Sequence, residues 1–129
     1  MKQDEQILVV QRAHLFPNTA VIPGFVPLSS FDEYMTRITN YQEFLWRSSM
    51  EENPLYKQIT PNMIFTHNNK FFLMRRRHDG NAKELRNKVT LGIGGHLRKE
   101  DTLLSNSIAE WGKREFEEEI SYQGSYKIR

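Results

Sequence analysis

The apolar positions in the first part of the chain predict one strand and one helix. Residues 7–11 are rich in β-branched side chains and predict a strand. Residues 18–27 contain two prolines and one glycine and predict a loop. Beyond it, apolar residues recur at spacings of three and four, which is typical of a helix with one apolar face: Phe31, Tyr34, Met35, Ile38, Tyr41 and Leu45. Ser30 and Glu33 fit a capping box at its start, and we expect the helix to end near Arg47.

The middle of the chain predicts a hairpin followed by a further strand. Residues 62–66 and 70–75 flank His67-Asn68-Asn69, which is a plausible turn. The second of these strands is apolar on both alternating faces, so we expect it to be covered on both sides. Residues 88–93 form another expected strand, which leads into Gly94-Gly95.

A last helix is expected from Asp101 or Thr102 to about Ile120, and residues 122–129 can add a final strand. On a helical wheel with about 100° per residue, one face is apolar. Glu115 and Glu119 fall inside that face and Glu118 at its edge, whereas Glu110 and Glu117 lie on the opposite side. The apolar face consists of Leu104, Ile108, Trp111, Gly112, Phe116 and Ile120.

The three glutamates on or beside the apolar face need a counter-charge. They are spaced by three and four residues, so their side chains converge, and burying them together costs several kcal/mol unless a cation is present. Arg114 can offset one of them at most. A divalent cation such as Mg²⁺ would offset all three, because it prefers oxygen ligands. A solvated or oligomer-facing run of charge is the other explanation, and both stay open at this point.

Composition limits the class of protein without naming a function. The 129 residues suffice for one domain, and 38% hydrophobic residues can build a core. The net charge of +2 permits a polyanionic partner without requiring one. The chain has no cysteine, no signal-peptide pattern and no apolar run long enough to cross a membrane, so we expect a cytoplasmic protein. Nucleic-acid binding is not favoured, since Phe71 and Phe72 lie in an apolar strand.

The sequence REFEEE at 114–119 resembles the core of the Nudix box, and Gly94-Gly95 resembles the double glycine that opens that motif. The similarity covers about residues 62–121. It implies an α/β fold, a Nudix-like α/β/α sandwich with a mixed sheet, of which this chain resembles the front portion. Residues 1–58 would then be an N-terminal extension with a strand and an amphipathic helix, and residues 59–129 the Nudix-like core.

The resemblance also implies a hydrolase that cleaves the diphosphate bond of a nucleoside diphosphate derivative with Mg²⁺ or Mn²⁺. Its metal ligands would be Glu115, Glu118, Glu119 and the backbone carbonyl of Gly94. Arg114 would orient the glutamates, and Glu118 would act with it in catalysis. The candidate substrate-binding residues are Arg75, Arg77, Gly95 and His96, although the arginines and the histidine also fit an ordinary polar surface.

Two other functions stay open. A truncated or degenerate Nudix-like domain could bind a nucleotide or a protein partner without turnover, and Ser121, where the family has glycine, favours it. A small interaction module could instead present the acidic helix to a basic partner. An exposed sheet edge would also invite a homodimer.

Overall fold

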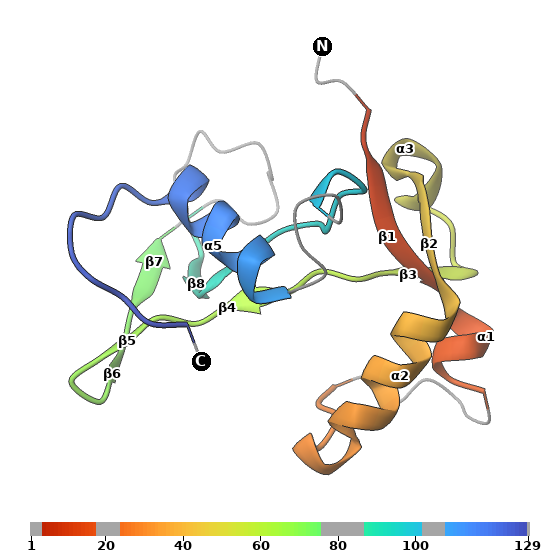
Figure 1. Ribbon diagram of the computed structural model, residues 1–129, viewed down its shortest axis with the longest axis horizontal. Helices are drawn as coiled ribbons and strands as arrows, with labels where there is room; N and C mark the ends of the chain where they lie inside the picture. The colour runs from red at the N-terminus through yellow and green to blue at the C-terminus, as the bar shows by residue number, and fades with distance from the viewer. Residues whose placement is uncertain (1–3, 18–23, 76–86, 102–107, 129) are drawn as a thin grey trace. The chain divides into compact units, whose positions relative to one another are not determined.

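The computed structural model describes residues 4–17, 24–75, 87–101 and 108–128, and it combines helices with several small antiparallel sheets (Figure 1). The chain forms two compact units. The first comprises Met1–Ile59 and His96–Asn106, and the second comprises Thr60–Gly95 and Ser107–Arg129. The segment His96–Asn106 therefore belongs with the N-terminal residues by its contacts, whereas the sequence boundaries assign it to the second part.

A three-stranded antiparallel sheet organises the first unit. Strand β1 (Gln6–Gln11) lies between β2 (Gln42–Trp46) and β3 (Tyr56–Gln58). Its four apolar residues, Ile7, Leu8, Val9 and Val10, are all at most 4% exposed. A strand that is buried on both faces must be apolar at every position, which explains why the run of β-branched residues predicts it correctly.

Among the described residues of the first unit, four helical segments accompany this sheet: α1 (Arg12–Leu15), the 3₁₀ helix η1 (Leu28–Ser30), α2 (Phe31–Tyr41) and α3 (Arg47–Met50). Helix α2 ends at Tyr41, so the expected continuation to Arg47 is wrong. Gln42 has an extended backbone, and the following strand β2 pairs with β1, where Leu45 lies opposite Ile7. Pairing with the buried strand outweighs the helical spacing of Leu45.

The expected capping box at the start of α2 is also wrong. Ser30 occupies the N-cap position, but its side chain makes no capping hydrogen bond. Glu33 instead forms an ion pair with Arg37 one turn later on the same helix. The i,i+4 pair thus replaces the reciprocal bond that the sequence suggests.

In its described residues, the second unit contains three short strand pairs and helix α5 (Ile108–Glu119). The pairs are β4 (Asn62–Met63) with β9 (Ile93–Gly94), β5 (Thr66–His67) with β6 (Lys70–Phe71), and β7 (Leu73–Arg75) with β8 (Val89–Leu91). The predicted hairpin is confirmed. Asn68 and Asn69 both have positive φ, 48° and 57°, which is the conformation of a two-residue hairpin turn that asparagine tolerates.

Three expectations about the second unit are wrong. The strand expected to be covered on both sides is exposed at Phe71, Phe72 and Leu73, and it is interrupted at Phe72. The strand expected at residues 88–93 is divided at Gly92, whose φ is +89° and which lies directly against the carbonyl oxygen of Met63. The described residues 120–128 form no strand, since they fold back on α5 instead, where Tyr126 and Phe116 have ring centroids 4.6 Å apart.

Truncating a buried apolar side chain should lower the free energy of unfolding more than truncating an exposed one. Ile7 is fully buried, so Ile7→Ala should lower the free energy of unfolding by roughly 2–5 kcal/mol. Leu73 is 59% exposed, so Leu73→Ala should change it by only about 0.5 kcal/mol. Urea denaturation of the two variants measures the difference, and equal costs would contradict the core as described.

Candidate functional site

Helix α5 contacts the strands of the second unit through a face on which a large side chain, Trp111, lies next to a glycine, Gly112. Trp111 is 3% exposed, and Gly112 beside it is buried. A Cβ atom at Gly112 would lie 3.2 Å from Sδ of Met63 in β4. The absence of a side chain at Gly112 therefore lets α5 approach β4 closely, and this approach sets the position of the glutamates on the next turn.

The carboxylate of Glu115 lies against the glycine segment. Its side chain is only 12% exposed. A Cβ atom at Gly95 would collide with Glu115 Oε1 and would lie 3.4 Å from Cζ2 of Trp111. Gly95 is held in place by its backbone N–H, which donates to the carbonyl of Pro61 at 3.3 Å. The structure thus brings together two of the predicted site residues, Gly95 and Glu115.

Arg114 connects two of the predicted carboxylates. Its Nη1 lies 2.8 Å from Oε2 of Glu118 and 3.4 Å from Oε2 of Glu115. The arginine side chain is 22% exposed and that of Glu118 is 52% exposed, so this cluster extends from a covered position to the surface. The guanidinium stabilises both carboxylates and fixes their orientation along the helix.

The other predicted ligands are placed differently. Glu119 is exposed on the last turn of α5, so its expected burial is wrong. Gly94 belongs to β9, where it pairs with Asn62. Among the residues that the structure describes, no three His, Asp or Glu side chains are grouped so that they could hold a metal ion. The expected convergence of three carboxylates is therefore limited here to Glu115 and Glu118.

The residue types still fit a hard divalent cation. Carboxylate oxygens of Glu115 and Glu118 and the carbonyl of Gly94 are the donors that Mg²⁺ and Mn²⁺ accept. The space that a Cβ atom would fill at Gly95 is the space that admits the Glu115 carboxylate. This contact is the local evidence that the glycine segment and α5 are fitted to each other.

The predicted substrate-binding residues do not gather at one described place. Arg75 is exposed on β7, opposite Val89 in β8. Arg77 lies outside the described residues. His96 belongs to the first unit, where its Nε2 lies 2.6 Å from Oε1 of Gln58. Because Gln58 Nε2 donates to the carbonyl of Met50 at 3.2 Å, Oε1 is the acceptor and His96 Nε2 is the donor.

A polar cluster in the first unit was not predicted from the sequence. Arg47 Nη1 lies 2.8 Å from Glu5 Oε1, and Arg47 Nε lies 3.0 Å from Glu51 Oε1. Both partners raise the pKa of Arg47. Glu5 and Arg47 are 42 residues apart, and no local spacing relates them.

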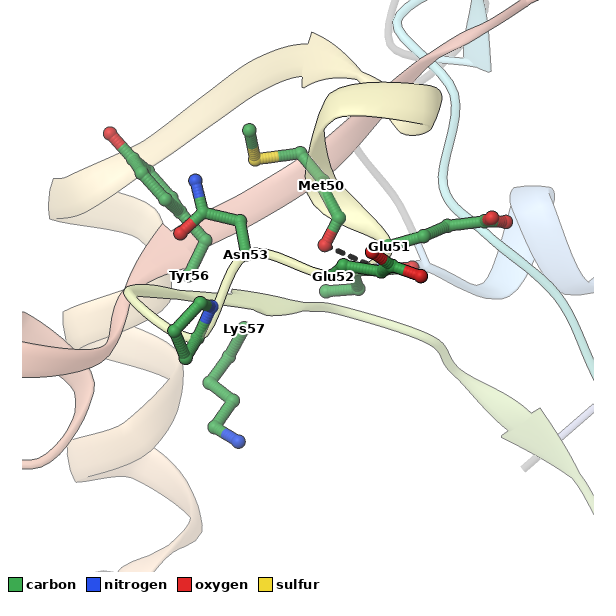
Figure 2. A pocket seen from close by; sticks show the side chains of 8 residues that line it. Met50, Glu51, Glu52, Asn53, Tyr56 and Lys57 are labelled. Carbon is green, nitrogen blue, oxygen red and sulfur yellow. Dashed lines mark hydrogen bonds between the residues drawn. The ribbon is translucent and has the colours of Figure 1, made fainter.

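A hollow of about 370 Å³ lies beside this cluster and is lined by residues 50–54 and 56–58 (Figure 2). Its charged residues are Glu51, Glu52 and Lys57, and Glu51 is already paired with Arg47. The hollow is open to solvent, and its lining includes none of the predicted site residues.

The comparisons with known proteins give one relative and no activity. No protein-family model matches the chain, and no solved structure matches it. The chain is 33% identical to Protein YmaB of Bacillus subtilis (strain 168) over 127 residues. That match covers 92% of this chain and 60% of YmaB, so the chain spans less than two thirds of its relative's length. In the described part of the chain, no helix has the length and apolar character needed to cross a bilayer.

Removal of the Arg114 guanidinium should destabilise the second unit. Arg114→Gln leaves the Glu115 carboxylate covered and without this counter-charge, which should lower the free energy of unfolding by roughly 1–3 kcal/mol. The matched control is Lys113→Gln, because Lys113 is exposed on the same helix. If both variants had the same urea midpoint, the pairing would not contribute to stability.

His96 should make stability depend on pH. Burial, followed by the nearby Arg47 charge, lowers the pKa of His96 below its ordinary value of 6.5. The unfolded chain then binds the proton more readily, so this contribution is complete above about pH 6.5 and is lost as the pH falls through the lowered pKa of the folded state. Between about pH 5 and 7, urea midpoints of the wild type should therefore fall toward acid more steeply than those of His96→Gln. Parallel curves would exclude this effect.

Proposed function

We propose that the chain belongs to a divalent-metal-dependent hydrolase that cleaves the diphosphate bond of a nucleoside diphosphate derivative. The observation that carries the proposal is the contact between the Glu115 carboxylate and Gly95, with Arg114 held between Glu115 and Glu118. These are the residues through which the sequence resembles the Nudix box. A largely covered carboxylate beside a glycine segment is expensive to maintain for packing alone, which supports a role in binding a cation.

In this proposal each residue has a distinct task. Glu115, Glu118, Glu119 and the Gly94 carbonyl would hold Mg²⁺ or Mn²⁺, and Arg114 would keep the first two carboxylates oriented. When bound, such an ion supplies neutralisation of the diphosphate charge and a more acidic water. Glu118 is the most accessible of the two paired carboxylates, so it is suited to accept a proton from that water.

The substrate and the fold are parts of the same proposal. Arg75, Arg77 and Gly95 would contact a small-molecule diphosphate, since arginine side chains match phosphate oxygens. The fold would be a Nudix-like α/β/α sandwich, and the protein would act in the cytoplasm. The mixed helices and antiparallel strands of this chain support that fold only at the level of class.

Binding without turnover is the second candidate. Glu115 and Glu118 both contact one guanidinium, and no group of three metal-ligating side chains occurs among the described residues. A site in this state could recognise a nucleotide or a protein partner and lack the full ligand set for catalysis.

Product release from a panel of nucleoside diphosphate derivatives tests the proposal. With Mg²⁺ or Mn²⁺ we expect turnover, and Glu118→Gln should reduce it by at least about a hundredfold, since a proton acceptor contributes that much or more. EDTA should abolish it. Glu110→Gln is the matched control, because Glu110 is an exposed glutamate of the same helix and should leave the rate unchanged.

The outcomes separate the two candidates. Metal-dependent turnover that is lost in Glu118→Gln and kept in Glu110→Gln supports the hydrolase. Nucleotide binding without product release under every metal would favour the second candidate. Turnover whose rate is changed neither by EDTA nor by the Glu118→Gln substitution would contradict the proposed site.

A further inference from the structure

We propose that Gly95 is a positioning residue: it holds the Glu115 carboxylate in its orientation by leaving open the space that a Cβ atom would fill. This inference rests on the proposed function for its chemical purpose, although the contact itself can be tested without it. Gly95 would then position a carboxylate of the protein itself, in addition to making the substrate contact that the sequence suggests.

A side chain at Gly95 would meet two residues of α5, Glu115 and Trp111. A Cβ atom at Gly95 would overlap Glu115 Oε1, at a distance that real Cβ atoms do not show, and would lie 3.0 Å from Glu115 Cδ, which is a tight contact. It would also lie 3.4 Å from the Trp111 ring, at ordinary contact distance. The carboxyl group is thus the atom group that excludes a side chain at this position, and Trp111 is compatible with one.

The carboxylate is the end of a flexible side chain, so it is the group that would move, and it would leave a covered position beside Arg114. Oε2 of Glu115 lies 3.4 Å from Nη1 of Arg114, and only 12% of the Glu115 side chain is exposed. The backbone of Gly95 is restrained as well, since its N–H donates to Pro61 and the preceding Gly94 pairs with Asn62. A methyl group at Gly95 must therefore displace the carboxylate from its place beside Arg114.

The other glycines of the segment are constrained by different atoms. At Gly92 the Cβ atom would meet the Met63 carbonyl, and φ is positive, so backbone conformation explains that glycine. At Gly94 the nearest atoms are Asn62 Oδ1 at 3.1 Å and the Pro61 carbonyl at 3.3 Å. Only at Gly95, among these three, is the nearest group a predicted site carboxylate.

A mutant cycle on stability tests the contact. Urea midpoints are measured without metal for the wild type, Gly95→Ala, Glu115→Ala and the double variant. We expect Gly95→Ala to lower the midpoint in the wild-type background and to lower it less than half as much in the Glu115→Ala background. Gly95→Ala in a Glu115→Gln background should give no relief, because glutamine keeps the shape of the side chain. Ile7→Val in the first unit is the packing control, and its effect should be the same with Glu115 or Ala at position 115.

The same chains are then titrated with Mn²⁺ alone, and binding is followed by the loss of the free-ion EPR signal. Gly95→Ala should weaken Mn²⁺ binding by at least about tenfold, because losing a contact that orients a metal ligand typically costs that much affinity. Glu110→Gln should bind as the wild type does, because Glu110 is exposed and lies outside the proposed ligand set.

The results decide between distinct claims. Equal midpoint shifts in both backgrounds, or failure of both Gly95→Ala and the double variant to fold, would overturn the inference. Unchanged Mn²⁺ affinity in Gly95→Ala would overturn it too. If the wild type bound no Mn²⁺, the proposed function would fail, and the mutant cycle alone would decide whether Gly95 positions Glu115.

Discussion

The structure of the second unit depends on how the charge of one covered carboxylate, that of Glu115, is balanced. Glu115 is 12% exposed, and a charge in that position must be balanced by a nearby cation and hydrogen bonds. Arg114 supplies the cation, and Gly95 supplies the space. Both requirements act at the point where α5 approaches the strands through Trp111 and Gly112. Packing and charge balance therefore constrain the same few residues, and a change in either affects the other.

The first unit depends on a different balance. Strand β1 is apolar along its buried length, whereas polar side chains tie its start to other segments. Arg47 donates its backbone N–H to the carbonyl of Glu5 at 2.9 Å and pairs with the Glu5 carboxylate. Hydrophobic burial thus gives this unit its stability, while the ion pairs at the end of the sheet fix which segments meet there.

Local patterns predicted the elements whose signals do not depend on distant residues. Strand β1 follows from its β-branched run, and the hairpin follows from Asn68 and Asn69. Leu45 was assigned to a helix because its spacing fits a period of 3.6, but its partner is Ile7, 38 residues away. The helical wheel correctly predicts that Glu115 is largely covered. It also assumes that the apolar face is covered along its whole length, whereas Glu119 on the last turn is exposed. The contact of Gly95 with Glu115 joins distant segments, and no periodicity could predict it.

The charge of the cluster separates the proposed functions most directly. Glu115 and Glu118 each carry a negative charge and share the Arg114 guanidinium. Glu117 and Glu119 add negative charge on the last turn of α5, where the helix macrodipole is also negative. Helix stability alone disfavours this distribution, because cations are preferred at a helix C-terminus. A divalent cation at this end of α5 would offset the unfavourable interaction of the carboxylates with the dipole, and for this reason we favour the metal-dependent function over binding without turnover.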